Sequence, residues 1–372
     1  MNKTALTLAL LAATAGPACA DSAVSVFGTI DLSGKYVKND GSAARYSLSQ
    51  DGIATSELGF KGFTDIGNGL KASFVLSSTV NADTGTTLGK FFNRRSTVSL
   101  TGPVGELRVG RDYLPTFWNN AYFDAFGTIG IGGSFNVWQL QAAYAASPAF
   151  GNVVRADNAI GYFLPANLGG IYGQAMVAAG EGGTNQGRVV SVRVGYRDGP
   201  LNVGVSAGQQ RFDLGSNPLV TGIAAGSHQN TFNAGAWYDL PLPGGLGNFR
   251  VLGFVDHDSR DNVSETRGTI SGVVRVGKSE VRLGYHRSKL TNDLAKNTNT
   301  DSEIAATYQY NLADAFAIYS TVGRLQNGNH PLAGVTQSVG GFNAPFVGSA
   351  ETAPTVAGGK SVGFEVGMRY SF

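Results

Sequence analysis

The chain is short of cysteine, of long apolar runs and of net charge. Its 372 residues contain one cysteine, Cys19, which excludes disulfide scaffolds and cysteine-ligated zinc or iron–sulfur sites. No run beyond residue 20 approaches the length of about eighteen apolar residues that a transmembrane helix needs. The 28 basic and 26 acidic residues nearly cancel, and no block of basic residues occurs. The charge pattern therefore argues against a nucleic-acid partner.

Glycine, in contrast, is abundant, with 53 residues, which is about twice the usual share. Only 15% of the residues are charged and 42% are hydrophobic, a composition that does not fit a disordered chain. The length would allow two or three domains, although all-β barrels form longer single units.

The first twenty residues have the pattern of a secretory signal peptide. Lys3 precedes a mostly apolar stretch at 5–15, and Ala18-Cys19-Ala20 offers a small-residue cleavage site before Asp21. A lipoprotein signal around Cys19 is the weaker interpretation, because the Gly or Ser expected after such a cysteine is missing. We expect residues 1–20 to be removed and residues 21–372 to form the mature protein.

The mature chain alternates between apolar and polar residues almost throughout. At the C-terminus, the even positions from Val362 to Phe372 are apolar, and the odd positions from Ser361 to Ser371 are polar or small. The N-terminal segment 24–36 and segments near 190–197, 281–286 and 303–310 repeat the pattern. Such alternation predicts β-strands with one apolar and one polar face.

The breaks between these segments alternate in length. Short Gly-, Pro- and Asn-rich breaks occur at 67–69, 102–105, 199–200, 277–279 and 311–314, and long ones at 39–54, 81–92, 112–154, 212–229 and 325–359. Short turns at one end and long loops at the other are typical of an outer-membrane barrel. About sixteen strands fit the length, and an even number places both termini on the turn side.

A soluble β-sandwich is the alternative architecture, since its strands also alternate. Aromatic residues at strand ends favour the barrel, because a membrane-spanning barrel carries aromatic girdles at both interfaces. These residues are Tyr36, Tyr162 with Phe163, Tyr308 with Tyr310, and Tyr370 with Phe372.

Several stretches resemble the Gram-negative general-diffusion porins, most closely their β-proteobacterial and neisserial branch. The matching stretches are Val26–Asp31, Glu57–Gly62, Asn93–Leu100, Gly105–Asp112, Arg155–Tyr162 and the terminal Phe372. The resemblance implies an all-β, sixteen-stranded antiparallel transmembrane β-barrel with short periplasmic turns, long extracellular loops and a third loop folded into the lumen. It also implies a homotrimer in the outer membrane. The C-terminal aromatics, Tyr370 and Phe372, would serve as the signal that the outer-membrane assembly machinery reads.

The third loop can be identified without the resemblance. The break at 112–154 is long, rich in glycine, and contains Phe117, Trp118, Phe123, Phe126 and Trp138. A large extracellular cap is one possibility, but an exposed apolar loop is an aggregation hazard. We therefore expect the loop to fold inward and narrow a channel.

In a channel, charged side chains at the narrowest point set selectivity. Strand parity places Arg95 on one face with Thr97, and Arg155 on one face with Asp157, and both faces point to the lumen. The resemblance implies wall arginines that face acidic groups of the third loop. We expect Arg95 and Arg155 to form the basic wall, Arg94 to be the alternative if the register differs, and Asp124 to be the acidic loop residue. Alternatively, these arginines only neutralise neighbouring carboxylates.

Glu57 departs from the family pattern, which usually has an arginine at this position. Its parity is lumenal, and a carboxylate near Arg95 or Arg155 would cancel part of their field. The sequence therefore predicts an outer-membrane channel for passive diffusion of ions and small hydrophilic solutes, with weak to moderate anion preference. Its location would be the outer membrane of a Gram-negative bacterium, reached by export through the periplasm.

The catalytic signals are weak. Gly204–Gly208 matches G-x-S-x-G but lies within an alternating strand, whereas a hydrolase needs a strand-to-helix elbow. Gly359-Lys360-Ser361 resembles only the end of a phosphate-binding loop. The four histidines never fall at metal-ligand spacing. We expect no enzyme, cofactor or metal, and the alternative function is an outer-membrane barrel lipase or protease.

Overall fold

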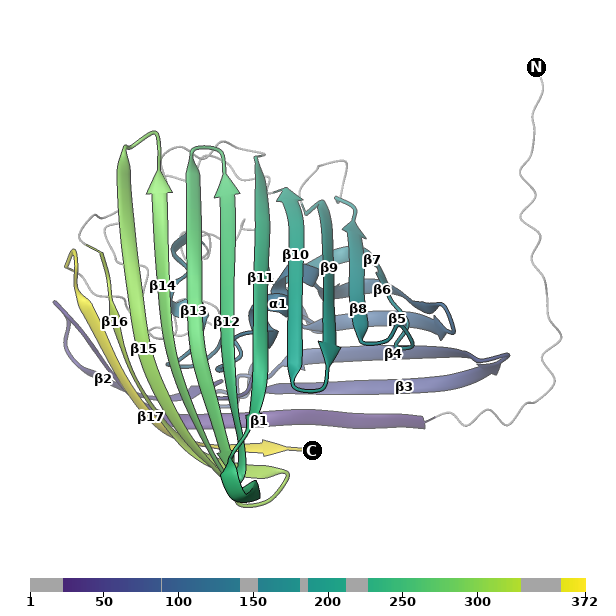
Figure 1. Cartoon of the computed structure of the whole chain (residues 1–372), viewed down its shortest axis with the longest axis horizontal. Coiled ribbons are helices and arrows are strands. Elements are labelled where there is room, and N and C mark those ends of the chain that lie inside the picture. The colour runs from purple at the N-terminus through teal and green to yellow at the C-terminus, as the bar shows by residue number, and fades with distance from the viewer. Residues whose placement is uncertain (1–22, 88, 141–152, 181–186, 212–226, 329–355) are drawn as a thin grey trace.

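The computed structural model describes residues 23–87, 89–140, 153–180, 187–211, 227–328 and 356–372, so the expected signal peptide lies outside the described residues. One antiparallel sheet contains every named strand and closes on itself (Figure 1). The strands are β1 (Ala23–Asn39), β2 (Arg45–Gln50), β3 (Glu57–Gly67), β4 (Leu70–Thr79), β5 (Arg95–Gly102), β6 (Gly105–Tyr113), β7 (Arg155–Phe163), β8 (Ile171–Ala178), β9 (Val189–Asp198), β10 (Leu201–Arg211), β11 (His228–Pro241), β12 (Gly247–Arg260), β13 (Val263–Val276), β14 (Ser279–Asn292), β15 (Asn297–Asn311), β16 (Phe316–Gln326) and β17 (Lys360–Ser371).

The barrel closes through β1, the first strand. One edge of β1 pairs with β17, from Thr29 opposite Ser371 to Asn39 opposite Ser361. Its other edge pairs with β3 along 23–29 and with β2 along 32–37. Because β2 and β3 share one position beside β1, the seventeen segments form a sixteen-stranded barrel, which confirms the predicted fold. The predicted loop at 39–54 therefore contains a short strand.

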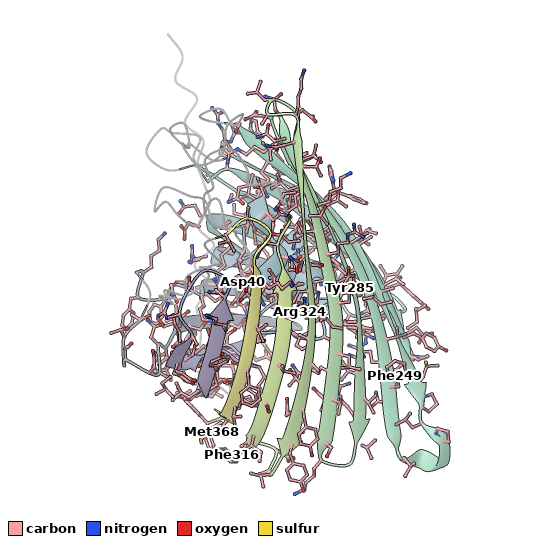
Figure 2. The ribbon with its side chains drawn as sticks, turned by 90° about the vertical axis from the view of Figure 1, so that its left-hand side faces the viewer. Asp40, Phe249, Tyr285, Phe316, Arg324 and Met368 are labelled. Carbon is pink, nitrogen blue, oxygen red and sulfur yellow. The ribbon has the colours of Figure 1, made fainter. Side chains whose placement is uncertain are left out.

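The polarity of the barrel is the reverse of that of a soluble protein. On β17, Phe364, Val366 and Met368 are exposed, whereas Ser361 and Glu365 are fully buried. Side chains project outward from the strands in Figure 2, where Met368 and Tyr285 are labelled. An apolar outer surface and a polar interior suit a barrel surrounded by hydrocarbon.

The turn end of the barrel carries aromatic residues on its outer face. The rings of Phe316 and Tyr370 lie 6.4 Å apart, and the ring of Phe372 lies 6.4 Å from that of Tyr370. Phe316 and Phe249 are labelled near this end in Figure 2. Aromatic side chains at the turn end of a barrel form the girdle that lies at a membrane interface.

The turns are built as their composition predicts. Between β3 and β4, Asn68 and Gly69 adopt positive φ values of 54° and 74°, as the tight turn of a two-residue hairpin requires. Two connections at the loop end, 261–262 and 293–296, are also short. The strands next to these short connections are long: β12, β13 and β14 have 14 residues each, and β15 has 15.

The third loop folds into the barrel, as the sequence predicts. It contains the helix α1 (Pro115–Tyr122) and the 3-10 helix η1 (Ser134–Val137), whereas η2 (Pro243–Gly245) lies in the turn between β11 and β12. Figure 1 shows α1 behind β10 and β11. The loop's ends meet where the Leu114 amide donates to the Val154 carbonyl at 2.9 Å. In the described part of the chain, no helix is long and apolar enough to cross a membrane.

Candidate functional site

The third loop is bound to the inner wall by polar side chains of α1. The Asn119 side-chain amide donates to Asn233 Oδ1 at 3.0 Å, and Asn120 donates to Asp256 at 3.3 Å. Arg193 of β9 donates in turn to Asn119. These groups are buried, so each hydrogen bond replaces one that water would otherwise make.

Just after α1, Phe123 packs against the wall. Its ring lies 5.5 Å from that of Trp237 and 6.4 Å from that of Phe254. Gly235 faces the Phe123 ring, and a Cβ at this position would overlap it. Glycine is therefore required at 235 for the loop to approach the wall this closely.

The remainder of the described loop follows the wall from β13 to β15. Glu265 accepts hydrogen bonds from the Gln139 and Leu140 amides at 2.9 and 2.6 Å. Glu303 accepts from the Asn136 side chain at 3.2 Å, and a His286 ring nitrogen lies 2.9 Å from the Gly132 carbonyl oxygen. The carboxylates of this wall are thus occupied in holding the loop.

Asp124, the acidic residue expected to face the arginines, serves the loop itself. Its carboxylate accepts hydrogen bonds from the backbone amides of Phe126, Thr128 and Ser134, at 2.9, 3.0 and 2.9 Å. The residue is 5% exposed. The structure does not bring it within ion-pair distance of Arg94, Arg95 or Arg155.

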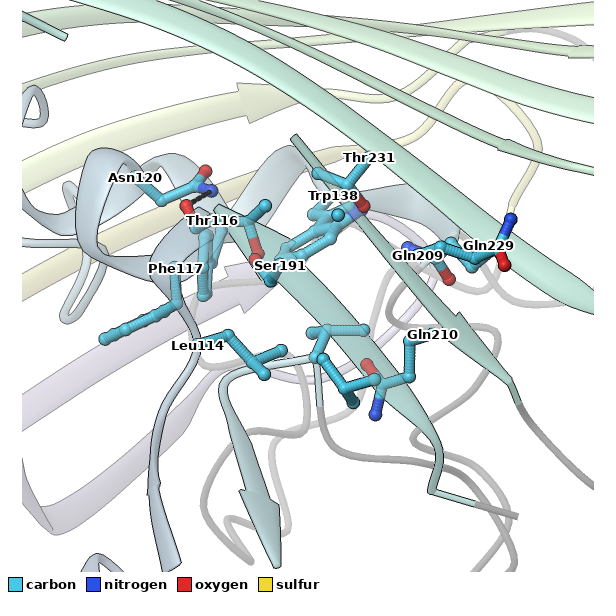
Figure 3. Close-up of a pocket in the computed structure, with 14 residues that line it drawn as sticks. Leu114, Thr116, Phe117, Asn120, Trp138, Ser191, Gln209, Gln210, Gln229 and Thr231 are labelled. Carbon is cyan, nitrogen blue, oxygen red and sulfur yellow. Dashed lines mark hydrogen bonds between the residues drawn. The ribbon is translucent and has the colours of Figure 1, made fainter. Parts of the chain in front are cut away.

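A small cavity lies on the wall side of α1 (Figure 3). Leu114, Thr116 and Asn120 line it from the loop, and Ser191 and Gln229 line it from the wall. Among the residues that the structure describes, none of the side chains lining it is charged.

The opposite wall, β3 to β7, has charged side chains of unequal accessibility: those of Arg94 and Arg108 are 12% and 13% exposed, and that of Asp112 is 3% exposed. The Glu57 side chain is 27% exposed and that of Arg95 23%, whereas the Asp256 side chain beneath the loop is 0% exposed. The described part of the loop also reaches β1 and β16, where Ile131 and Val137 pack against Val37 and Leu325. Glu57 and Arg95 remain among the accessible charged side chains of the inner surface.

One ionic cluster on this wall is centred on Tyr113. Arg94 pairs with Glu57 at 2.6 Å, and its guanidinium lies 5.9 Å from the centre of the Tyr113 ring. The Arg155 guanidinium lies 4.4 Å from the same ring and donates to the Tyr113 hydroxyl at 2.9 Å. The structure thus brings together Glu57, Arg94 and Arg155 of the predicted site residues.

A second ionic cluster lies beside the first. Asp112 is 3.5 Å from Arg95 and 2.6 Å from Arg108, and Arg108 also pairs with Glu106 at 2.7 Å. Arg111 pairs with Asp157 at 2.6 Å, as does Lys90 at 2.5 Å. We call the two clusters together the β5–β7 network: Lys90, Arg94, Arg95, Arg108, Arg111, Arg155, Glu57, Glu106, Asp112 and Asp157. Its six basic and four acidic side chains leave two positive charges, and the carboxyl group of Asp51, which interacts with Arg94, reduces this surplus to one.

Sequence reasoning missed Tyr113, Arg108 and Asp112. Parity within the stretch 105–112 could have found Arg108, because it alternates with the exposed Leu107 and Val109. Tyr113 gives no comparable signal, since it lies where the chain leaves the wall.

The proposed assembly residues are at the seam of the barrel. The Phe372 amide donates to the Gly28 carbonyl at 3.0 Å, and the Gly28 amide donates to the Phe372 carbonyl at 2.9 Å. Tyr370 stands opposite Ile30 in the β1–β17 register. Both residues thus belong to the last contacts that close the sheet.

A closed barrel with an apolar exterior, a charged inner wall and a loop folded inside defines a class of protein: the membrane-spanning β-barrel channel. A model of the Gram-negative porin family matches residues 7–330. The chain is 32% identical to outer membrane porin protein 32 of Delftia acidovorans over 381 residues, covering 100% of both chains. It is 24% identical to a major outer membrane protein P.IB of Neisseria meningitidis, covering 87% of this chain and 92% of that protein.

Among solved structures, the anion-selective porin from Comamonas acidovorans superposes with a TM-score of 0.77 at 30% identity. The match covers 95% of this chain and 100% of that one. The chain belongs to the Gram-negative porin family and is an outer-membrane diffusion channel, not an enzyme. The G-x-S-x-G stretch accordingly lies within β10, where Ser206 donates to Asn233 beneath the loop.

Proposed function

We propose that this porin passes small anions in weak to moderate preference to cations, and that Arg94, Arg155 and Arg95 set this preference. The observation that carries the proposal is the unequal charge of the β5–β7 network, where six basic side chains outnumber four acidic ones and the neighbouring Asp51. Charges at a constriction act at short range, where screening by salt is incomplete.

The opposite wall adds little negative charge to the passage. Its carboxylates, including Asp256 and Glu265, are buried beneath the third loop and hydrogen-bonded to it. An ion in the accessible part of the barrel therefore meets the β5–β7 network first. The structural relative from Comamonas acidovorans, described as anion-selective, supports the same sign.

Glu57 limits the preference. It pairs with Arg94 at 2.6 Å, so part of the positive field at the Tyr113 cluster is cancelled. For this reason the proposal is a modest preference instead of strict anion selectivity.

The resemblance to general-diffusion porins supports three further proposals. Residues 1–20 act as a signal peptide, and residues 21–372 form the mature barrel. The barrel assembles as a homotrimer surrounded by outer-membrane lipid. Phe372 and Tyr370 present the terminal strand to the assembly machinery.

The test is the reversal potential of the purified porin in planar bilayers across a potassium chloride gradient. Anion preference gives a potential with the sign of the chloride equilibrium, and the magnitude falls as salt rises because the network is screened. A potential of cation sign, or zero at low salt, would refute the proposal. Hydrolytic activity without stepwise conductance would contradict the channel itself.

A further inference from the structure

The helix of the third loop is amphipathic in an unusual direction. Its buried residues are Pro115, Thr116, Asn119 and Asn120, which face the wall. Trp118 is half-buried against the hydrophobic cluster that includes Tyr113 and Trp138, and Tyr122, one turn further on, is 45% exposed. A helix inside a protein normally buries its aromatic residues, so the exposed ring of Tyr122 needs another explanation.

These rings belong to a continuous series. The centres of Tyr113 and Trp118 are 5.1 Å apart, and those of Trp118 and Tyr122 are 5.5 Å apart. Tyr122 lies 6.5 Å from Trp237 of β11. We call Tyr113, Trp118, Tyr122 and Trp237 the aromatic series; it connects the β5–β7 network with the wall near the turns.

Arginines flank the series along its length. Arg155 lies over Tyr113, and Arg193 lies 4.6 Å from the centre of the Tyr122 ring. At the far end, the guanidinium groups of Arg197 and Arg250 lie 5.6 and 4.5 Å from the centre of Trp237. A guanidinium is attracted to the electron-rich face of an aromatic ring, and the same guanidinium can pair with the carboxylate of a ligand whose ring packs beside it.

Two of these arginines have no carboxylate partner in the described part of the chain. Arg193 donates to Asn119 and to the Tyr172 hydroxyl, and Arg197 is exposed with no ion pair to any described residue. Arg250, by contrast, makes a two-pronged pair with Asp239, at 2.8 and 2.7 Å. The Arg197 guanidinium is therefore available to a carboxylate that passes through the channel.

We propose that the aromatic series and its arginines form a binding track for small aromatic carboxylates of the benzoate class. The ligand's ring stacks on the exposed ring of Tyr122, beside the half-buried ring of Trp118. Its carboxylate pairs with guanidinium groups, first those near Tyr113 and then Arg197. An aliphatic carboxylate lacks the stacking face, and a neutral arene lacks the charge. The proposal deepens the proposed function, because it rests on a channel that admits anions.

The experiment measures how benzoate, cyclohexanecarboxylate and acetate block the chloride current of the porin in planar bilayers. Benzoate and cyclohexanecarboxylate have the same charge and nearly the same size, so they differ mainly in the π-face. We expect benzoate to block at a concentration about fivefold lower than cyclohexanecarboxylate, as one stacking contact implies.

The variants Tyr122→Leu and Trp118→Leu keep apolar bulk but remove the ring. Each should bring the ratio of the blocking concentrations of cyclohexanecarboxylate and benzoate towards one. Arg197→Gln should weaken block by both cyclic carboxylates and leave their ratio unchanged. Phe232→Leu is the matched control, because Phe232 is 55% exposed on the outer face of the barrel.

Equal block by benzoate and cyclohexanecarboxylate in the wild type would overturn the track. So would a ratio that survives both Tyr122→Leu and Trp118→Leu in channels with normal chloride conductance. The reversal potential is measured in the same bilayers without carboxylate. Loss of anion preference there, with the benzoate ratio intact, would refute the proposed function and leave the track standing.

Discussion

The ion pair between Glu57 and Arg94 shows how one residue can moderate a channel's charge. The pair spans 2.6 Å, and both side chains are partly accessible from the interior. Its consequence is local: it fixes how much of the Arg94 charge acts on a passing ion.

Replacing Glu57 by glutamine should strengthen anion preference. The change removes one negative charge and releases the Arg94 guanidinium, and Glu57→Arg should act further in the same direction. The reversal potential at low salt measures the effect. Asp314→Asn is the control, since Asp314 is exposed in the turn before β16 and distant from the network. An unchanged potential for both Glu57 variants would show that Glu57 does not line the passage.

Replacing Arg155 by glutamate should move selectivity towards cations. The substitution changes the local charge by two units and removes the hydrogen bond to the Tyr113 hydroxyl. The shift should shrink as salt is raised towards about 1 M, where the screening length falls to about 3 Å. Selectivity that matches wild type at every salt concentration would exclude Arg155 from the passage.

Parity could not decide which of Arg94 and Arg95 meets Glu57. Arg94 precedes β5, outside the alternating segment, and its direction depends on how the second loop enters the strand. Arg155 was placed by parity, yet Asn158 has a φ of 52° and the β6–β7 register shifts between Gly110 and Asp112. Such irregularities interrupt the two-residue period of a strand, so alternation alone does not fix where the Arg155 side chain lies. Its position follows from its contacts with Tyr113.

Among the elements, the third loop is held in place by apolar packing against the wall and by a set of polar contacts. Asparagines of α1 bind the wall at β11 and β12, and Glu265 binds the loop amides at 139 and 140. Hydrogen bonds to charged groups contribute about 1.5 to 3 kcal/mol each, more than neutral ones. The loop is thereby fixed across the interior.

Deleting most of the loop between Tyr122 and Trp138 should raise single-channel conductance. The deletion removes Phe123 and Asn136, which contact the wall, and Asp124, which orders the loop itself, and so enlarges the narrowest cross-section. Heat-modifiable mobility on gels serves as the control for a closed barrel. Wild-type conductance in a correctly closed variant would mean that the loop does not limit flux.

Glu265→Gln should make the current noisier without closing the channel. The amide is a weaker acceptor than the carboxylate, so the bonds to Gln139 and Leu140 weaken and the loop moves more. Glu280→Gln provides a matched control, because Glu280 pairs with Arg275 and Arg282 away from the loop. Equal noise in the two variants would contradict the anchoring role of Glu265.

The strands and the inward loop could be predicted from the sequence because lipid enforces strict alternation and because a long apolar loop must pack somewhere. Strand β2 could not, since its six residues lie inside a stretch with loop-like composition and gain their order by pairing with β1. The short connections at 261–262 and 293–296 were missed for a related reason. Strands β12 to β15 extend beyond the usual length, which turn composition alone does not reveal.

At the scale of the whole molecule, the terminal strand completes a sheet that would otherwise have two open edges. Open edges leave backbone groups unpaired, which hydrocarbon does not tolerate. Every strand of the closed barrel depends on this seam, where Gly28 and Phe372 exchange two hydrogen bonds.

Deleting Phe372 should therefore impair assembly. The deletion removes both bonds to Gly28 and the aromatic ring that packs beside Gly28 at the seam. Yield of heat-modifiable protein in the outer membrane measures the effect, and Phe372→Tyr, which keeps the aromatic ring, is the control. Normal amounts of folded protein from the deletion variant would disprove the role of Phe372.

The pairing of β1 with β17 also constrains when folding can finish. Ser33 donates a hydrogen bond to Glu365, a residue 332 positions later in the chain. Ribosomes make β1 first and its partner last, so the earliest strand waits through nearly the entire synthesis for its neighbour. Contacts of such long sequence separation form slowly. Before β17 is available the sheet cannot close, so the unfinished chain must be kept from aggregating until its final residues have been translated and exported.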